Sequence, residues 1–132
     1  MIPANLGDQL VGKIIRVAAV DTSATTNGTA IDLAGYSGEI GIILNAAHGS
    51  GNSDNTLAIK FQDSADGSTS WNDISGATFS TVDGTNDSLQ LLSLNKDEVK
   101  RYIRSVTTMA GTSKSFVYGM SLVGMKKYQD GA

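Results

Sequence analysis

The 132-residue sequence contains no cysteine and only one proline. Without cysteine, the fold uses no disulfide, no thiolate nucleophile and no cysteine-ligated zinc. Charged residues make up only 17% of the chain and aromatic residues 6%. Serine, threonine, asparagine and 15 glycines take their place. This composition favours many short strands joined by turns, because threonine suits a pleated surface while glycine and asparagine adopt positive φ angles.

Long hydrophobic runs are also missing. The longest apolar stretches, such as residues 41–44, are far too short to cross a membrane. The N-terminus lacks a basic segment followed by an apolar one, so we expect no signal peptide and synthesis in the cytoplasm. Hydrophobic residues still make up 40% of the chain, which is enough for one core, and the length suits a single domain.

Charge is sparse and unevenly divided. Residues 1–94 carry three bases against ten acids, whereas residues 95–132 carry seven bases against three acids. The net charge of −3 and the isoelectric point near 4.9 argue against nucleic-acid binding. The densest basic cluster is formed by Lys100, Arg101 and Arg104. It could bind an acidic surface, or it could be a solvated strand face with alternating charge.

The hydrophobic pattern predicts strands throughout. Leu57, Ile59 and Phe61 alternate with other residues and share a face, and the same spacing recurs in residues 116–122. Residues 10–20 read as one strand or two strand segments, with a helix as the weaker option. Residues 88–94 form a further strand, and we expect residues 21–29 and 46–55 to be a polar turn and a loop.

One short helical turn is expected near residues 95–100. Asn95 is a good N-cap, and Glu98 follows at the capping-box position. Together these elements predict an all-β fold: a single-domain β-sandwich, jelly-roll-like, with eight or nine strands. We expect a flexible N-terminal arm at residues 1–9, the β-sandwich domain at 10–124 and a polar C-terminal tail at 125–132.

The stretch DSADGSTSW, residues 63–71, is the most suggestive local motif. A calcium loop counted from Asp63 lacks acids at its third and fifth positions and the glutamate at its twelfth. An Asp-box hairpin of sialidase-like propellers has a similar order, but here the glycine comes one place early and the motif occurs once. We interpret the stretch as a hairpin turn reversed by Asp66 and Gly67, with Trp71 at the sheet edge.

No other motif indicates catalysis. His48 is the only histidine and lies in a predicted loop, without a nucleophile elbow or metal-binding partners. Residues 49–51 form a Gly-x-Gly with no helix after it to hold a phosphate. Asp97 and Glu98 suit the first turn of a helix, where carboxylates are favoured by the helix dipole. We therefore expect no enzyme, no cofactor and no metal site.

The order of several short motifs along the chain resembles that of a known class of proteins. Residues 30–36 (AIDLAGY), an apolar strand, residues 57–67 (LAIKFQDSADG) and residues 88–91 (SLQL) are followed by residues 100–104 (KRYIR), 110–113 (AGTS) and 116–119 (FVYG). Over residues 30–124 this series resembles small virion structural proteins of tailed bacteriophages, the accessory type encoded near the major capsid gene.

The resemblance implies a capsid decoration (cement) protein. Such a protein binds the major capsid protein lattice, often as a homotrimer, and stabilises the head at the virion surface, without nucleic acid or membrane as a partner. The alternatives are a neck or tail accessory protein, and a carbohydrate-binding β-sandwich that uses Trp71, Tyr36 and Tyr102 as stacking platforms. The candidate capsid contacts are the arm residues Ile2, Pro3 and Leu6 and the basic cluster Lys100, Arg101 and Arg104.

Overall fold

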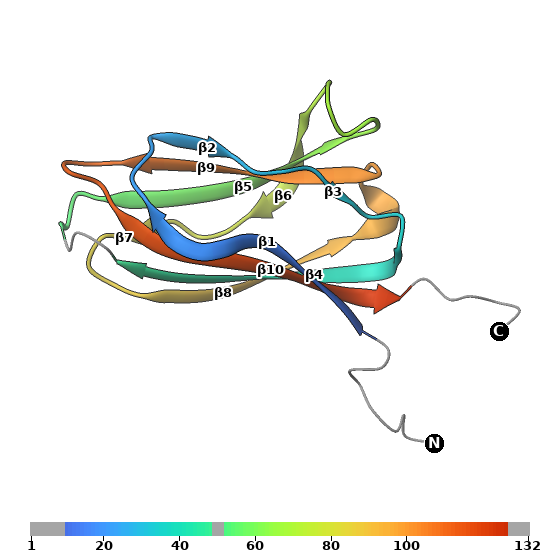
Figure 1. Cartoon of the computed structure of the whole chain (residues 1–132), viewed down its shortest axis with the longest axis horizontal. Coiled ribbons are helices and arrows are strands. Elements are labelled where there is room, and N and C mark those ends of the chain that lie inside the picture. The colour runs from blue at the N-terminus through green and yellow to red at the C-terminus, as the bar shows by residue number, and fades with distance from the viewer. Residues whose placement is uncertain (1–9, 49–51, 127–132) are drawn as a thin grey trace, which may run out of the picture.

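The computed structural model describes residues 10–48 and 52–126, which form a two-layer all-β sandwich, as predicted (Figure 1). The expected arm contacts Ile2, Pro3 and Leu6 lie outside the described residues, as does the tail from residue 127 onward. β1 begins at Leu10, and β10 continues to Lys126, two residues past the predicted end of the sandwich.

All strand pairs in both sheets are antiparallel. We call the four-stranded layer sheet A; its order is β1 (Leu10–Asp21), β10 (Phe116–Lys126), β4 (Tyr36–His48) and β8 (Ser88–Asn95). The other layer, sheet B, has the order β2 (Thr25–Asn27), β9 (Tyr102–Ala110), β5 (Thr56–Ser64) and β6 (Asn72–Thr78), with β3 (Ile31–Asp32) paired to β9 and β7 (Val82–Asp83) paired to β5.

The core lies between the inward faces of the two sheets. Along β5 the predicted alternation is confirmed, since Leu57, Ile59 and Phe61 are at most 2% exposed. Phe61 meets Phe79 edge to face, with ring centroids 6.1 Å apart. The matching inward residues of β10 are Phe116, Tyr118, Met120 and Leu122, all buried. Alternating apolar residues on two sheets thus supply one shared core.

The predicted helical turn is confirmed as a short 3-10 helix, η2 (Lys96–Glu98), between β8 and β9. The Asn95 side-chain oxygen accepts a hydrogen bond from the Asp97 backbone N–H at 2.9 Å. The cap ends β8, and the turn carries the chain from sheet A to sheet B.

Two boundaries differ from the sequence expectation. The predicted polar turn at residues 21–29 contains β2, because Thr25 and Thr26 pair with β9, which is an inner strand of sheet B. Residues 46–48 of the predicted loop at 46–55 belong to β4, which continues to His48 along β10. In each case pairing with a neighbouring strand overrode the local turn signal.

A buried polar cluster ties β1 to sheet B. The Tyr118 hydroxyl and the Thr26 hydroxyl each donate to the Asp21 carboxylate at 3.0 Å, and the Ser23 N–H donates to it at 2.9 Å. Burial raises the pKa of Asp21, but these hydrogen bonds outweigh it and the pKa lies below its ordinary value. Burial also raises the pKa of Tyr118, which keeps its hydroxyl a donor. The cluster therefore fixes the end of an edge strand that has few inward side chains of its own.

Candidate functional site

The outward side of sheet A is an exposed apolar surface. Opposed residues in antiparallel strands point to the same side, so the strand register gives the rows of this surface. One row runs across β10, β4 and β8 through Gly119, Asn45 and Leu89. The next row begins on β1 and contains Ile14, Ser121, Ile43 and Leu91. We define the apolar face by its larger side chains, which are Ile14, Val17, Val20, Ile43, Leu89, Leu91, Val117 and Val123.

The exposure of this face is unusual. Leu91 is 77% exposed, Leu89 72%, Val17 69% and Ile14 64%. Side chains of this size are ordinarily exposed singly, whereas here they adjoin one another over four strands and no charged residue stands in either row. Contiguous apolar patches of this kind are typical of surfaces that bind other molecules.

A shallow groove of about 330 Å³ crosses the apolar face. Gly119 and Ser121 of β10 line it, between Val17 on β1 and Leu89 on β8. At Gly119 a Cβ would lie 3.1 Å from the Ala18 backbone, so the close approach of β1 favours glycine there. Arg16 stands at the rim, but its guanidinium lies 4.1 Å from the centre of the Tyr118 ring and donates to the Tyr118 carbonyl. The groove is therefore lined mainly by apolar side chains, with Asn45 and Ser121 as its uncharged polar residues.

The outward side of sheet B is polar and hydrogen-bonded within itself. Arg104 donates twice to the Gln62 side-chain oxygen, at 3.0 and 2.9 Å. The Gln62 amide donates to Asp73 at 2.9 Å, and Lys60 pairs with the same carboxylate at 3.1 Å. The Arg104 guanidinium also lies over the Trp71 ring, 4.6 Å from its centre. Each polar group of this network has a partner in the chain, so the surface does not need another molecule to satisfy it.

The DSADGSTSW stretch is the turn that the sequence predicted. Asp66 accepts hydrogen bonds from the Thr69 hydroxyl and from the Ser68 and Thr69 N–H groups, which hold its pKa far below the ordinary value. Gly67 adopts a φ of 77°, and a Cβ there would lie 2.9 Å from the Tyr102 ring. The carboxylate thus closes its own loop, and the loop packs on β9.

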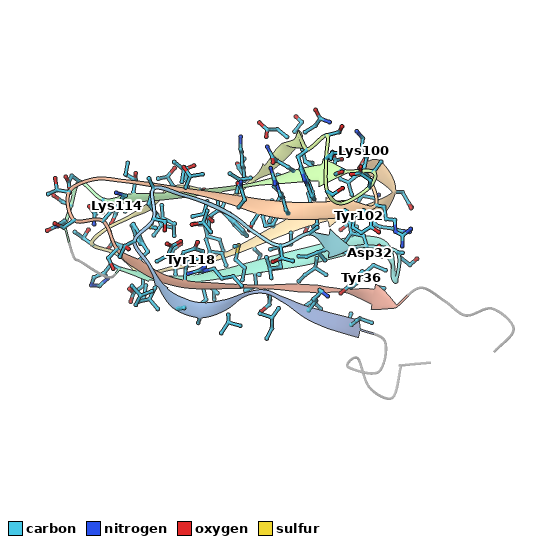
Figure 2. The ribbon with its side chains drawn as sticks, turned by 45° about the horizontal axis from the view of Figure 1, so that its top comes forward. Asp32, Tyr36, Lys100, Tyr102, Lys114 and Tyr118 are labelled. Carbon is cyan, nitrogen blue, oxygen red and sulfur yellow. The ribbon has the colours of Figure 1, made fainter. Side chains whose placement is uncertain are left out.

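The basic cluster is brought to one end of the sandwich, where Figure 2 shows Lys100 near Tyr102 and Asp32. Arg101 forms a bidentate pair with Asp32 at 2.9 and 2.8 Å. These two hydrogen bonds, with a third from the Ala34 N–H, lower the pKa of Asp32 to about 2. Arg104 is held by Gln62, whereas the backbone N–H of Lys100 donates to Asp63. An acidic partner would therefore have to compete for Arg101 and Arg104 but not for the exposed Lys100.

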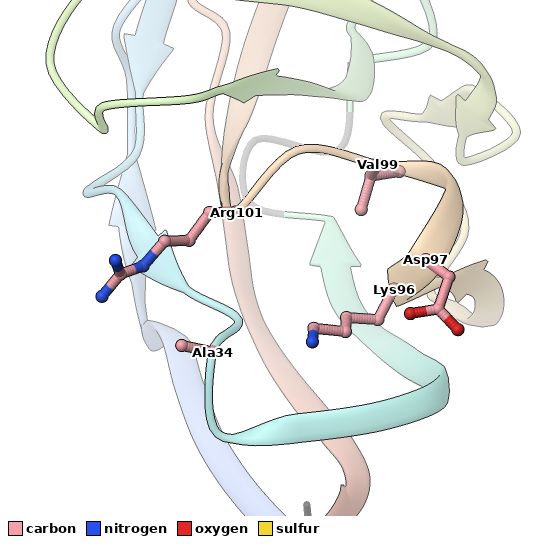
Figure 3. A pocket seen from close by; sticks show the side chains of 5 residues that line it. All are labelled: Ala34, Lys96, Asp97, Val99 and Arg101. Carbon is pink, nitrogen blue, oxygen red and sulfur yellow. The ribbon is translucent and has the colours of Figure 1, made fainter.

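A hollow of about 470 Å³ lies beside this cluster, lined by Ala34, Lys96, Asp97, Val99 and Arg101 (Figure 3). Lys96 and Asp97 belong to η2, and Ala34 follows β3. The Arg101 guanidinium is already engaged by Asp32. We assign the hollow no ligand, because its charged groups come in opposite signs and one of them already has a partner.

His48 lies at the end of β4 and not in a loop. Its Nδ1 is 3.0 Å from an Asp87 carboxylate oxygen, and both side chains are exposed. Within residues 10–48 and 52–126 no three His, Cys, Asp or Glu side chains are grouped so that they could hold a metal ion. No helix in this part of the chain is long and apolar enough to cross a membrane.

The three aromatic residues considered for carbohydrate stacking are all engaged within the chain. Tyr36 is buried, at 5% exposure. Trp71 carries Arg104 on its ring, and Tyr102 is flanked by Gly67 and by the Arg101 guanidinium 5.1 Å from its centre. The geometry therefore does not favour them as a glycan platform.

The sequence did not single out the apolar face. One signal was present: residues 88–94 have leucines at both odd and even positions, namely Leu89, Leu91, Leu92 and Leu94. A strand can turn only every second residue inward, so a strand that is apolar at both parities has apolar side chains on both sides. In β8 it is Leu94 that is buried, while Leu89 and Leu91 face outward.

Comparisons with known proteins show the fold alone. No protein-family model matches the sequence, and no curated protein does. Among solved structures, the PBSX exported protein XepA is similar, with a TM-score of 0.58 and 13% identity over 91% of this chain. Dimeric latent PorU from Porphyromonas gingivalis has a TM-score of 0.52 and 11% identity over 94% of this chain. This chain spans only 38% and 13% of those two proteins.

A weaker likeness, too low to support an inference, is to infectious bursal disease virus, Gx strain, with a TM-score of 0.48 and 14% identity. It covers 87% of this chain and 31% of the viral chain. The neighbours thus confirm a β-sandwich found both in a phage protein and in other settings.

Proposed function

We propose that this chain is a non-enzymatic structural component of a tailed-bacteriophage virion, which binds the major capsid protein lattice and stabilises the head. The observation that carries the proposal is the apolar face. A small sandwich whose polar surface is satisfied internally, but which exposes Leu89, Leu91 and Ile14 together, is suited to assembly with other protein surfaces. The resemblance of residues 30–124 to small virion proteins suggests that this assembly is a phage virion. The sandwich fold shared with the phage protein XepA is compatible with that role.

Contacts with the lattice are proposed for the arm residues Ile2, Pro3 and Leu6 and for the basic cluster. An apolar arm that orders on binding adds buried area. Of the cluster, Lys100 is the residue best placed to meet an acidic surface, because Arg101 and Arg104 already have partners. Repetition by the symmetry of a shell turns modest single contacts into stable attachment. The resemblance implies a trimer on the head; a neck or tail position is the alternative.

The test uses purified protein and expanded capsids that lack decoration. We expect saturable, stoichiometric binding and a higher temperature of capsid disruption. Deletion of residues 2–8 and the variant Lys100→Glu should each lower the occupancy. The matched control is Lys114→Glu, which reverses a charge at the opposite end of the sandwich (Figure 2). Absence of binding, together with retention on a glycan array, would favour the carbohydrate-binding alternative.

A further inference from the structure

The apolar face combines a ridge and a groove at matching positions. Leu89 and Leu91 project from the edge strand β8 and form the ridge. Gly119 and Ser121 of β10 line the groove. The register places Leu89 in the row of Gly119, and Leu91 in the row of Ser121, with Asn45 and Ile43 of β4, which also line the groove, between them. The ridge on β8 and the part of the groove over β10 therefore lie at the same height along the strands, two strands apart.

This arrangement is complementary to itself. A twofold axis parallel to the strands, passing over β4 between two facing sheets, exchanges the positions of β8 and β10. Each ridge then lies over the groove of the second copy, with Leu89 opposite Gly119 and Leu91 opposite Ser121. An interface of this kind uses the same patch on both copies, as twofold contacts do.

We propose that two copies of this chain pack face to face through their apolar faces, with Leu89 and Leu91 of each entering the groove of the other. Sheets pack about 10 Å apart when their side chains interdigitate in this way. With the axis over β4, the strands β10, β4 and β8 overlap; three strands spaced about 4.8 Å apart, over about nine residues, give roughly 430 Å² of flat area per copy. Two such faces bury roughly 900 Å², which is the size of weak, reversible interfaces.

Charge also favours a second copy as the occupant. In a twofold contact a charged residue near the axis faces its own copy and is repelled. The two rows of ridge and groove contain no charged residue, although the chain has a net charge of −3. The occupied and hydrogen-bonded outer side of sheet B offers no comparable surface.

Sedimentation of the protein alone, over a wide concentration range, tests the pairing without any capsid. We expect a monomer–dimer equilibrium, weakened at least about 30-fold in the variant Leu89→Lys/Leu91→Lys, since two buried leucines become charged. The control Thr78→Lys/Thr108→Lys places the same charges on the exposed side of sheet B and should leave the equilibrium unchanged.

Engineered cysteines test the register, because the natural chain has none. Leu91→Cys and Ser121→Cys, made as two separate single variants, face each other across the proposed interface about 10 Å apart, which is too far for a disulfide but within reach of a short bis-maleimide cross-linker. When the two variants are mixed and treated with this reagent, we expect covalent dimers on a denaturing gel. A mixture of Val106→Cys and Thr78→Cys, whose sites lie in one row of sheet B, is the matched control and should give none.

A monomer at all concentrations, a trimer in solution, or unchanged association of Leu89→Lys/Leu91→Lys would overturn the pairing while leaving the proposed function standing. The pairing is also overturned if the protein is monomeric alone but that variant loses capsid binding, because the apolar face then belongs to the capsid contact. Conversely, dimers that do not bind capsids would support the pairing and contradict the proposed function.

Discussion

The two sheets of this protein bury the same kinds of side chain inward and differ in what they turn outward. Sheet A exposes aliphatic residues around a groove, whereas sheet B exposes a network in which Arg104, Gln62, Asp73 and Lys60 satisfy one another. Both outer sides are formed by strands whose side chains alternate between inside and outside. The fold itself therefore does not require one outer side to be apolar and the other polar. Polar groups that already hydrogen-bond to one another gain little stability from contact with a second protein surface. Exposed leucines, in contrast, lower the free energy of the system when another surface buries them away from water.

The largest expected effect tests whether the inward side chains of the two sheets form one shared core. Phe61 is fully buried on sheet B and packs on Phe79. Phe61→Ala should lower the free energy of unfolding by about 3–5 kcal/mol, because it removes contacts and leaves a cavity. Leu91→Ala, on the outward side of sheet A, should change it by less than about 0.5 kcal/mol. Urea unfolding measures both; equal losses would mean that Leu91 is not an outward residue of the isolated domain.

The link between the sheets is expected to contribute less. Tyr118→Phe removes one donor from the buried Asp21 carboxylate and should cost about 1–3 kcal/mol of unfolding free energy. Hydrogen exchange should rise most in β1, since the cluster fixes its end to β2. Tyr102→Phe removes a hydroxyl from a less buried ring and serves as the control. Exchange that rises equally in all strands would contradict a local role for the cluster.

The network on sheet B should matter little for stability. Arg104→Ala removes the contact with Trp71 and the hydrogen bonds to Gln62, for a loss of up to about 1 kcal/mol. Because Trp71 is the only tryptophan, its fluorescence reports the change directly. Lys114→Ala, at the end of the sandwich opposite Lys100 and Tyr102, should leave the emission unaltered. An unchanged spectrum in Arg104→Ala would show that the guanidinium does not lie over the indole in solution.

The smallest expected effect is a pH dependence confined to sheet B. The pKa of Asp32, about 2 beside Arg101, lies below the ordinary 3.8, so its contribution to stability is complete above 3.8 and is lost as the pH falls toward 2. The melting temperature of Asp32→Asn should therefore be lower than that of the natural chain near neutrality and should fall less steeply over this acid range. Parallel curves for the two proteins would contradict the role of the pair.

Patterns local to the chain were readable from the sequence. The alternation of Leu57, Ile59 and Phe61 gave a strand with its buried side, and Asn95 gave the start of the helical turn. The turn at Asp66 and Gly67 was equally clear, because an aspartate that caps its own loop and a glycine with positive φ act over a few residues. Such signals hold because their partners are close in sequence.

Pairing across the chain was decided only by the tertiary structure. β2 forms because β9 lies beside it, and β4 extends to His48 because β10 does. Arg101 pairs with Asp32 and Arg104 hydrogen-bonds to Gln62, and both partners lie far away in the sequence. The sequence by itself determined that the chain forms strands with apolar residues at both parities in residues 88–94. Only the stacking of two sheets decided which leucines fill the core and which stay outside, because each strand has one inward side.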